Sequence, residues 1–180
     1  MPDVMPDGVQ VSGRVIRVVK DDITMLEVDA FVFYAEPGLA LGSGFGTAIT
    51  VRGGPTVQKE LEGLAPVATG EAVVSAAGNL TAKHIIHAVG PRFQEEDLEG
   101  KLRTTMVNAL KRAEEQQIKR LALPAMGAGY YGVPVEMCAK VMLEELQRHL
   151  AGETGLEEVT ICVLDTRQFD CFQAALAAVS

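Results

Sequence analysis

Cysteine is scarce in this sequence and shows no pairing pattern. Three cysteines, Cys138, Cys162 and Cys171, occur in 180 residues, each within an apolar run. An odd number of cysteines, without C-x-x-C or Cys/His ligand spacing, argues against a disulfide framework and against a thiolate metal site. We therefore expect buried free thiols, no metal and no cofactor, in a reducing, cytoplasmic setting.

Long hydrophobic runs and a cationic leader are also lacking. No stretch approaches the roughly 18 apolar residues that a membrane-spanning helix needs. Residues 1–8 do not place a basic segment before an apolar one, as a secretory leader would. The sequence thus predicts a soluble protein without a membrane partner.

Basic side chains are few relative to acidic ones. The chain has 16 Lys and Arg against 24 Asp and Glu, which gives a net charge of -8. Such a field repels nucleic-acid backbones and anionic lipid headgroups at long range, so nucleic acid is not expected as a partner. Any anion that binds has to be held by local backbone donors instead.

Apolar residues, by contrast, are abundant and patterned. They make up 48% of the chain, enough for one core, and 180 residues fit a single domain spanning 1–180. Strand-like and helix-like patterns alternate, which predicts a three-layer α/β/α sandwich with a mixed sheet and a ligand crevice beyond the carboxyl ends of the central strands. Expected strands are 9–19, 30–35, 71–77, 84–89, 121–123 and 158–164; expected helices are 55–64, 98–117, 134–150 and a short one around 169–176.

Two glycine-rich loops follow apolar strands and precede expected helices. The first, 38–46, contains Gly42, Gly44 and Phe45, and the second is 127–129. Unshielded backbone N–H groups beside a helix N-terminus can hold a phosphate or diphosphate. The alternative is that these glycines serve tight turns alone. Gly42-x-Gly44 lacks a third glycine at dinucleotide-binding spacing, and no P-loop motif occurs.

Several short motifs, taken in order, resemble the macro domain. They are Asp22-Ile23-Thr24, Val28-Asp29-Ala30, Thr69-Gly70-Glu71-Ala72-Val73-Val74, Gly78-Asn79-Leu80, His87-Ala88-Val89-Gly90-Pro91, Leu123-Pro124-Ala125 and Gly127-x-Gly129-Tyr130-Tyr131-Gly132-x-Pro134. The resemblance covers about residues 21–164. It implies a six-stranded mixed sheet flanked by helices, with a cleft for ADP-ribose at the strand ends.

The resemblance also implies ligand contacts. Asp22 matches the family aspartate that accepts from the adenine amino group, and a carboxylate suits that role because it offers only acceptors; the alternative is a turn residue. Residues 127–130 match the diphosphate loop, Tyr131 the aromatic beside the distal ribose, and Asp165 the adenine edge. The implied set is Asp22, Ile23, Gly42, Gly44, Phe45, Gly127, Ala128, Gly129, Tyr130, Tyr131 and Asp165.

The chain departs from the family pattern where hydrolytic members hold their catalytic pair. Their Asn-Ala-Ala-Asn is replaced by Phe33-Tyr34-Ala35-Glu36, and Gly46 stands where the water-activating aspartate would be. General-base activation of water by that route is therefore not available. Glu36 remains a weak catalytic candidate, since it can accept from a ribose diol or act as a displaced base; otherwise it is a solvated loop acid.

Three functions follow from this comparison. The leading expectation is a binding module for ADP-ribose, an ADP-ribosylated ligand or a related nucleotide diphosphate. The second is an ADP-ribosyl or O-acetyl-ADP-ribose hydrolase with a variant mechanism through Glu36. The third is a degenerate scaffold without a nucleotide ligand.

Overall fold

A seven-stranded mixed sheet forms the centre of the molecule. The computed structural model describes residues 8–42 and 45–179. The strand order is β1-β2-β7-β6-β3-β5-β4, with β1 and β4 antiparallel to their neighbours and the other pairs parallel. The strands are β1 (Val9–Val11), β2 (Arg14–Lys20), β3 (Ala30–Ala35), β4 (Ala72–Ala76), β5 (His84–Val89), β6 (Arg120–Leu123) and β7 (Glu158–Val163).

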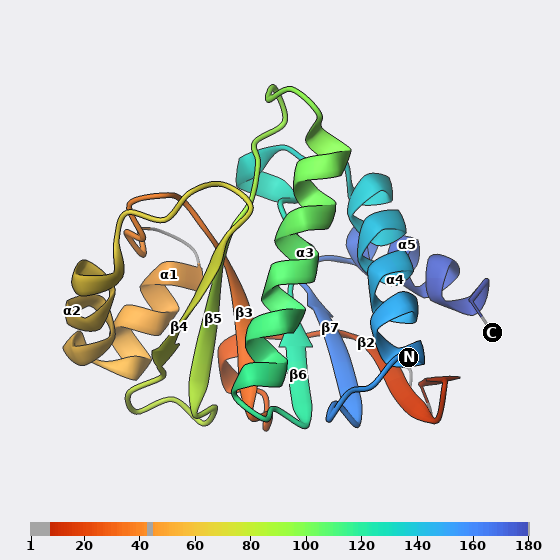
Figure 1. Cartoon of the computed structure of the whole chain (residues 1–180), viewed down its shortest axis with the longest axis horizontal. Coiled ribbons are helices and arrows are strands. Elements are labelled where there is room, and N and C mark those ends of the chain that lie inside the picture. Colours follow the sequence, from red (N-terminus) through yellow and green to blue (C-terminus); the bar gives the residue numbers. More distant parts are fainter. Residues whose placement is uncertain (1–7, 43–44, 180) are drawn as a thin grey trace.

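Helices cover both faces of this sheet, as the alternating pattern predicts (Figure 1). One face packs against α3 (Leu98–Glu115), α4 (Val135–Ala151) and α5 (Thr166–Ala177). The other packs against α2 (Pro55–Leu64) and the short segment formed by α1 (Phe45–Ala48) and the π-helical turn η2 (Ile49–Gly53). The three-layer α/β/α prediction is confirmed.

The central strand β3 shows why its sequence lacks alternation. Val32 and Tyr34 point into the core beneath α3 and α4, whereas Phe31 and Ala35 point into the core beneath α2. Because successive side chains of a strand face opposite sides, a strand buried on both faces needs apolar residues throughout.

The sheet has seven strands rather than the expected six because the segment 9–19 is a hairpin and not one strand. Ser12 and Gly13 both adopt positive φ, 51° and 82°, and Val11 pairs with Arg14 across them. Two consecutive residues with positive φ form the tight turn whose twist suits a two-residue hairpin. Serine is an uncommon residue in that conformation, so the turn was not evident from the sequence.

A buried polar pair lies on the α2 side of the sheet. His87 on β5 is 0% exposed, and its Nε2 lies 2.8 Å from the Ser75 hydroxyl. That hydroxyl donates to the Ala76 carbonyl at 3.0 Å, so His87 Nε2 is assigned as the donor to Ser75. Burial disfavours the imidazolium and lowers the pKa of His87 to about 4.

The depressed pKa of His87 makes stability depend on pH. The unfolded chain binds a proton at this side chain below about pH 6.5, whereas the folded chain does so near pH 4, so acidification favours unfolding between these values. We expect the free energy of unfolding to fall by roughly 2 kcal/mol from pH 6.5 to 5. Urea titrations at both pH values measure this loss, and His87→Gln, which keeps a donor for Ser75, should abolish it. Equal pH slopes for the two proteins would contradict the assignment.

Candidate functional site

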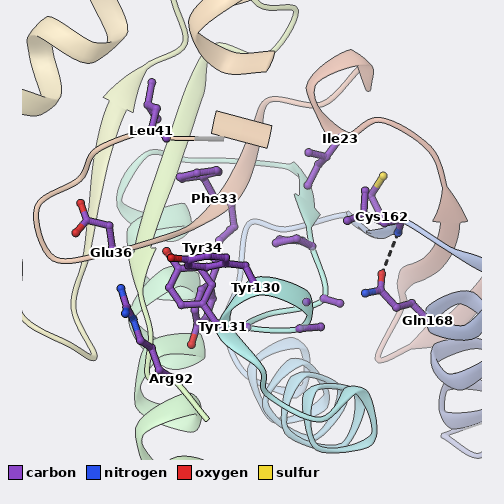
Figure 2. A pocket seen from close by; sticks show the side chains of 18 of the residues that line it. Ile23, Phe33, Tyr34, Glu36, Leu41, Arg92, Tyr130, Tyr131, Cys162 and Gln168 are labelled. Carbon is purple, nitrogen blue, oxygen red and sulfur yellow. Dashed lines mark hydrogen bonds between the residues drawn. The ribbon is translucent and has the colours of Figure 1, made fainter. Parts of the chain in front are cut away.

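A cavity of about 500 Å³ opens beyond the carboxyl ends of β3, β6 and β7, where the crevice was predicted (Figure 2). Its walls come from the strand ends, from the two glycine-rich loops and from the start of α5. The lining residues are Ile23, Val32, Phe33, Tyr34, Glu36, Ala40, Leu41, Gly42, Arg92, Pro124, Ala125, Gly127, Ala128, Gly129, Tyr130, Tyr131, Cys162, Leu164 and Gln168.

The loop after β6 lines this cavity with residues 127–131. Gly129 begins a 3-10 turn, η3 (Gly129–Tyr131), and the first N–H groups of such a turn have no acceptor within it. Gly127 and Gly129 have positive φ, 84° and 78°. A Cβ on Gly127 would lie 2.6 Å from Val133, whereas one on Gly129 would meet nothing within 4 Å. Packing against Val133 therefore requires glycine at position 127, whereas the space beside Gly129 is not filled by other described residues.

These loop glycines carry a spacing that the sequence-based prediction overlooked. Gly127, Gly129 and Gly132 match G-x-G-x-x-G, the pattern of dinucleotide-binding loops. In this fold the helix that follows, α4, begins at Val135, and the 3-10 turn lies between it and the first two glycines. The chain nevertheless returns to the loop just before α4, because the Val133 backbone N–H donates to the Gly127 carbonyl at 2.9 Å.

Aromatic rings form the wall beside this loop. Tyr34 is buried, its hydroxyl donates to the Pro91 carbonyl, and Tyr131 packs edge-on against it with 4.8 Å between ring centroids. A Cβ on Gly90 would lie 2.2 Å from the Tyr34 ring, so glycine is needed at position 90. Tyr130 is 85% exposed. Tyr34 and Gly90 are therefore fitted to each other.

Two opposite charges occupy one end of the cavity (Figure 2). Glu36 Oε1 accepts from the Ala40 backbone N–H at 2.8 Å, which ties the carboxylate to its own loop. The Arg92 guanidinium lies 5.7 Å from the centroid of the Tyr131 ring. In the described parts of the chain, no ion pair joins Glu36 to Arg92. Arg92 was not predicted, although a cation directly after the strand-end sequence Gly90-Pro91 was the available signal.

Asp22 does not line the cavity, although Ile23 beside it does. The Asp22 carboxylate caps a 3-10 turn: Oδ1 accepts from Thr24 N at 2.9 Å and from Thr24 Oγ1 at 2.6 Å, and Oδ2 pairs with Arg52. Partial burial opposes its charge, but the hydrogen bonds from Arg52 and Thr24 outweigh that effect and lower the pKa of Asp22. Both oxygens of this carboxylate are therefore engaged within the protein.

The segment after β7 contributes a different residue from the one predicted. Asp165 caps α5 by accepting from Gln168 N at 2.8 Å, and it does not line the cavity. Gln168 lines it instead, together with Leu164 and Cys162. The D-x-x-Q spacing of a helix cap was the sequence signal for this pair. Phe169, one position further along α5, is buried in the core.

The first glycine-rich loop contributes Ala40, Leu41 and Gly42 to the cavity lining. Gly44 lies outside the described residues, and for Phe45 the backbone alone is described, at the start of α1. Gly46 is buried in α1, and a Cβ there would lie 1.5 Å from the Leu41 carbonyl oxygen. That backbone approach leaves no room for a side chain at position 46.

The cysteines form no reactive or metal-binding cluster among the described residues. Cys138 and Cys162 are buried free thiols whose pKa burial raises to about 12, whereas Cys171 is half-buried. Within residues 8–42 and 45–179, no three His, Cys, Asp or Glu side chains come together as metal ligands. No helix there is long and apolar enough to cross a bilayer.

Comparison with known sequences gives one family. The family model of the macro domain matches residues 34–142. A macro domain-containing protein of Chlorobaculum tepidum is 36% identical over 179 residues, which covers 97% of this chain and 99% of that protein. An uncharacterized protein of Saccharolobus solfataricus is 37% identical over 171 residues, with 93% and 95% covered.

Solved structures show the same fold. The Oceanobacillus iheyensis macrodomain with ADP has a TM-score of 0.90 at 24% identity, covering 98% of this chain and 96% of that one. A Trypanosoma brucei macrodomain in complex with ADP-ribose has a TM-score of 0.83 at 22% identity, covering 92% and 69%.

Proposed function

The chain belongs to the macro domain family, and on this premise we propose that it binds ADP-ribose or a closely related nucleotide diphosphate. The observation that carries the proposal is the cavity of about 500 Å³ lined by the Gly127–Gly129 loop. A cavity of this size suits a small-molecule ligand. Two structural relatives hold ADP and ADP-ribose, which supports the same ligand class here.

Backbone donors are the basis of diphosphate binding in this proposal. The net charge of -8 provides no general attraction for an anion, so the contact has to be local. The backbone amides of Gly129 and Tyr130, at the start of η3, are the proposed donors to the diphosphate. Successive N–H groups without a partner in the turn can form a concavity that accepts phosphate oxygens. Ala128 has no hydroxyl that could add a hydrogen bond, so binding of the diphosphate by this loop depends on backbone atoms.

We further propose that the module binds without hydrolysing. Gly46 has no space for a side chain that could activate water. Glu36 accepts from Ala40 N and so serves the loop, although it lines the cavity near Arg92. A missing general base typically forfeits about 10²–10⁴-fold in rate.

The test combines binding and turnover. A ligand at 100 times its dissociation constant stabilises the folded state by about 2.7 kcal/mol, which raises the melting temperature of a domain this size by about 5–10 °C. We expect such a shift with ADP-ribose, and chromatography should show no release of ADP-ribose from modified protein or of acetate from O-acetyl-ADP-ribose.

Two outcomes would replace this proposal. Efficient turnover that is lost in Glu36→Gln, a variant that keeps the bond from Ala40 N, would establish the hydrolase with Glu36 as its base. No thermal shift and no calorimetric heat at millimolar ADP-ribose would leave the scaffold without a nucleotide ligand.

A further inference from the structure

The amide of Gln168 has a fixed orientation at the wall of the cavity. Its Oε1 accepts from the Leu164 backbone N–H at 3.0 Å, and its own backbone N–H is held by Asp165. Because Leu164 N is a donor, the oxygen of the amide has to face it. The Nε2 group with its two protons is therefore on the other arm of the amide.

The Nε2 donors of Gln168 are unused by the residues that the structure describes. In the described part of the chain, Nε2 has no hydrogen-bond partner, and the side chain is half-buried where it lines the cavity. Figure 2 places Gln168 next to Cys162, at the end of the cavity away from Glu36 and Arg92. A pre-oriented amide donor thus faces the cavity among the apolar side chains of Ile23 and Leu164.

Asp22 offers a different group from Gln168. Its two carboxylate oxygens already accept from Thr24 and Arg52, and the side chain is not part of the cavity lining. A carboxylate offers acceptors only, so Asp22 could accept from the amino group of a base but could not donate to a ring nitrogen. The donor role therefore falls to Gln168.

We propose that Gln168 recognises the base of the nucleotide by donating from Nε2 to a ring nitrogen of a purine. This inference rests on the proposed nucleotide binding and adds the residue that recognises the base. Adenine offers the ring acceptors N1, N3 and N7, so an amide donor complements its edge. The apolar side chains beside Gln168 supply the surface against which the ring packs.

The experiment pairs Gln168 variants with ligands that lack one acceptor each. Calorimetry would measure the dissociation constants of ADP and of its 1-deaza, 3-deaza and 7-deaza analogues for wild type, Gln168→Leu and Gln168→Glu. Glutamate keeps an oxygen for Leu164 N and suits the first turn of a helix, so Gln168→Glu should fold with an unchanged or higher melting temperature. It replaces the donor with an acceptor.

The expected result is that the effects of removing Gln168 Nε2 and of removing one ring nitrogen on the affinity are not additive, because both changes remove the same hydrogen bond. ADP should bind Gln168→Leu about five- to tenfold more weakly than wild type, the range of one neutral hydrogen bond, and Gln168→Glu more weakly still. One deaza analogue should bind wild type and Gln168→Leu equally, because the bond is already missing.

Other outcomes overturn the inference. If changing Gln168 lowers the affinity for every deaza analogue by the same factor as the affinity for ADP, the residue acts through helix α5 and does not contact the base. If both Gln168 variants bind ADP as wild type does, Gln168 does not recognise the base. Absence of any ADP and ADP-ribose binding by wild type would instead remove the proposed function itself.

Discussion

Gly129→Asp should weaken ADP-ribose binding at least about a hundredfold, whereas Gly129→Asn should cost only a few-fold. A side chain at this position meets no atom within 4 Å, so it would extend into open space beside the loop. A carboxylate about 5 Å from a diphosphate charge is repelled by about 3 kcal/mol at an effective dielectric constant of 20. Calorimetry on both variants measures the difference.

The asparagine variant is the matched control for this prediction. Both residues have to adopt the positive φ of 78° at Gly129, and both tolerate it better than most side chains. Their volumes are nearly equal, so the charge is the difference that remains. Equal binding by the two variants, with intact melting curves, would mean that no anion approaches this loop.

Gly46→Ala should destabilise the fold by about 3–5 kcal/mol, since overpacking against backbone lies at the severe end of single substitutions. The added carbon would lie 1.5 Å from the Leu41 carbonyl oxygen and 2.4 Å from its carbonyl carbon. Relief would require the loop before α1 to separate from the helix. Urea unfolding of the purified variant gives the free-energy change.

The control for this substitution is another glycine in a helix. Gly63 in α2 has no atom within 4 Å of an added Cβ, so Gly63→Ala should stabilise the protein by about 0.5–1 kcal/mol through helix propensity. If Gly46→Ala changes the free energy of unfolding no more than Gly63→Ala does, the loop at Leu41 moves aside at little cost, and position 46 can also hold an aspartate. If Gly46→Ala is strongly destabilising, Gly46→Asp cannot place a water-activating carboxylate there without moving the loop.

Most of the architecture could be predicted from local patterns. The helix 55–64 was placed at the bounds of α2, and the strands 30–35 and 84–89 at those of β3 and β5. Pro55 and Leu61 illustrate why: proline suits the first turn of a helix, and apolar spacing marks its buried face. The α1 and η2 segment was missed because its sequence is rich in glycine and β-branched residues, which are poor helix formers.

The candidate site was predicted in outline and less well in detail. The strand-end location and the loop lining at Gly127, Gly129 and Tyr131 agree with the cavity. Asp22 and Asp165 were expected at the ligand, whereas Gln168 was not among the expected residues. Asp22 pairs with Arg52, thirty positions away along the chain, and the free amide of Gln168 results from a helix cap, so neither arrangement has a local sequence signature.

The fit between Tyr34 and Gly90 also restricts how this protein can change over evolutionary time. Any side chain at position 90 collides with the Tyr34 ring, and a Cβ at position 127 would lie 3.0 Å from its hydroxyl oxygen. A side chain at position 90 is therefore possible only where residue 34 is smaller than tyrosine, whereas position 127 is also closed by Val133. As long as tyrosine occupies position 34, position 90 has to stay glycine, so these two positions can change only together or with residue 34 first.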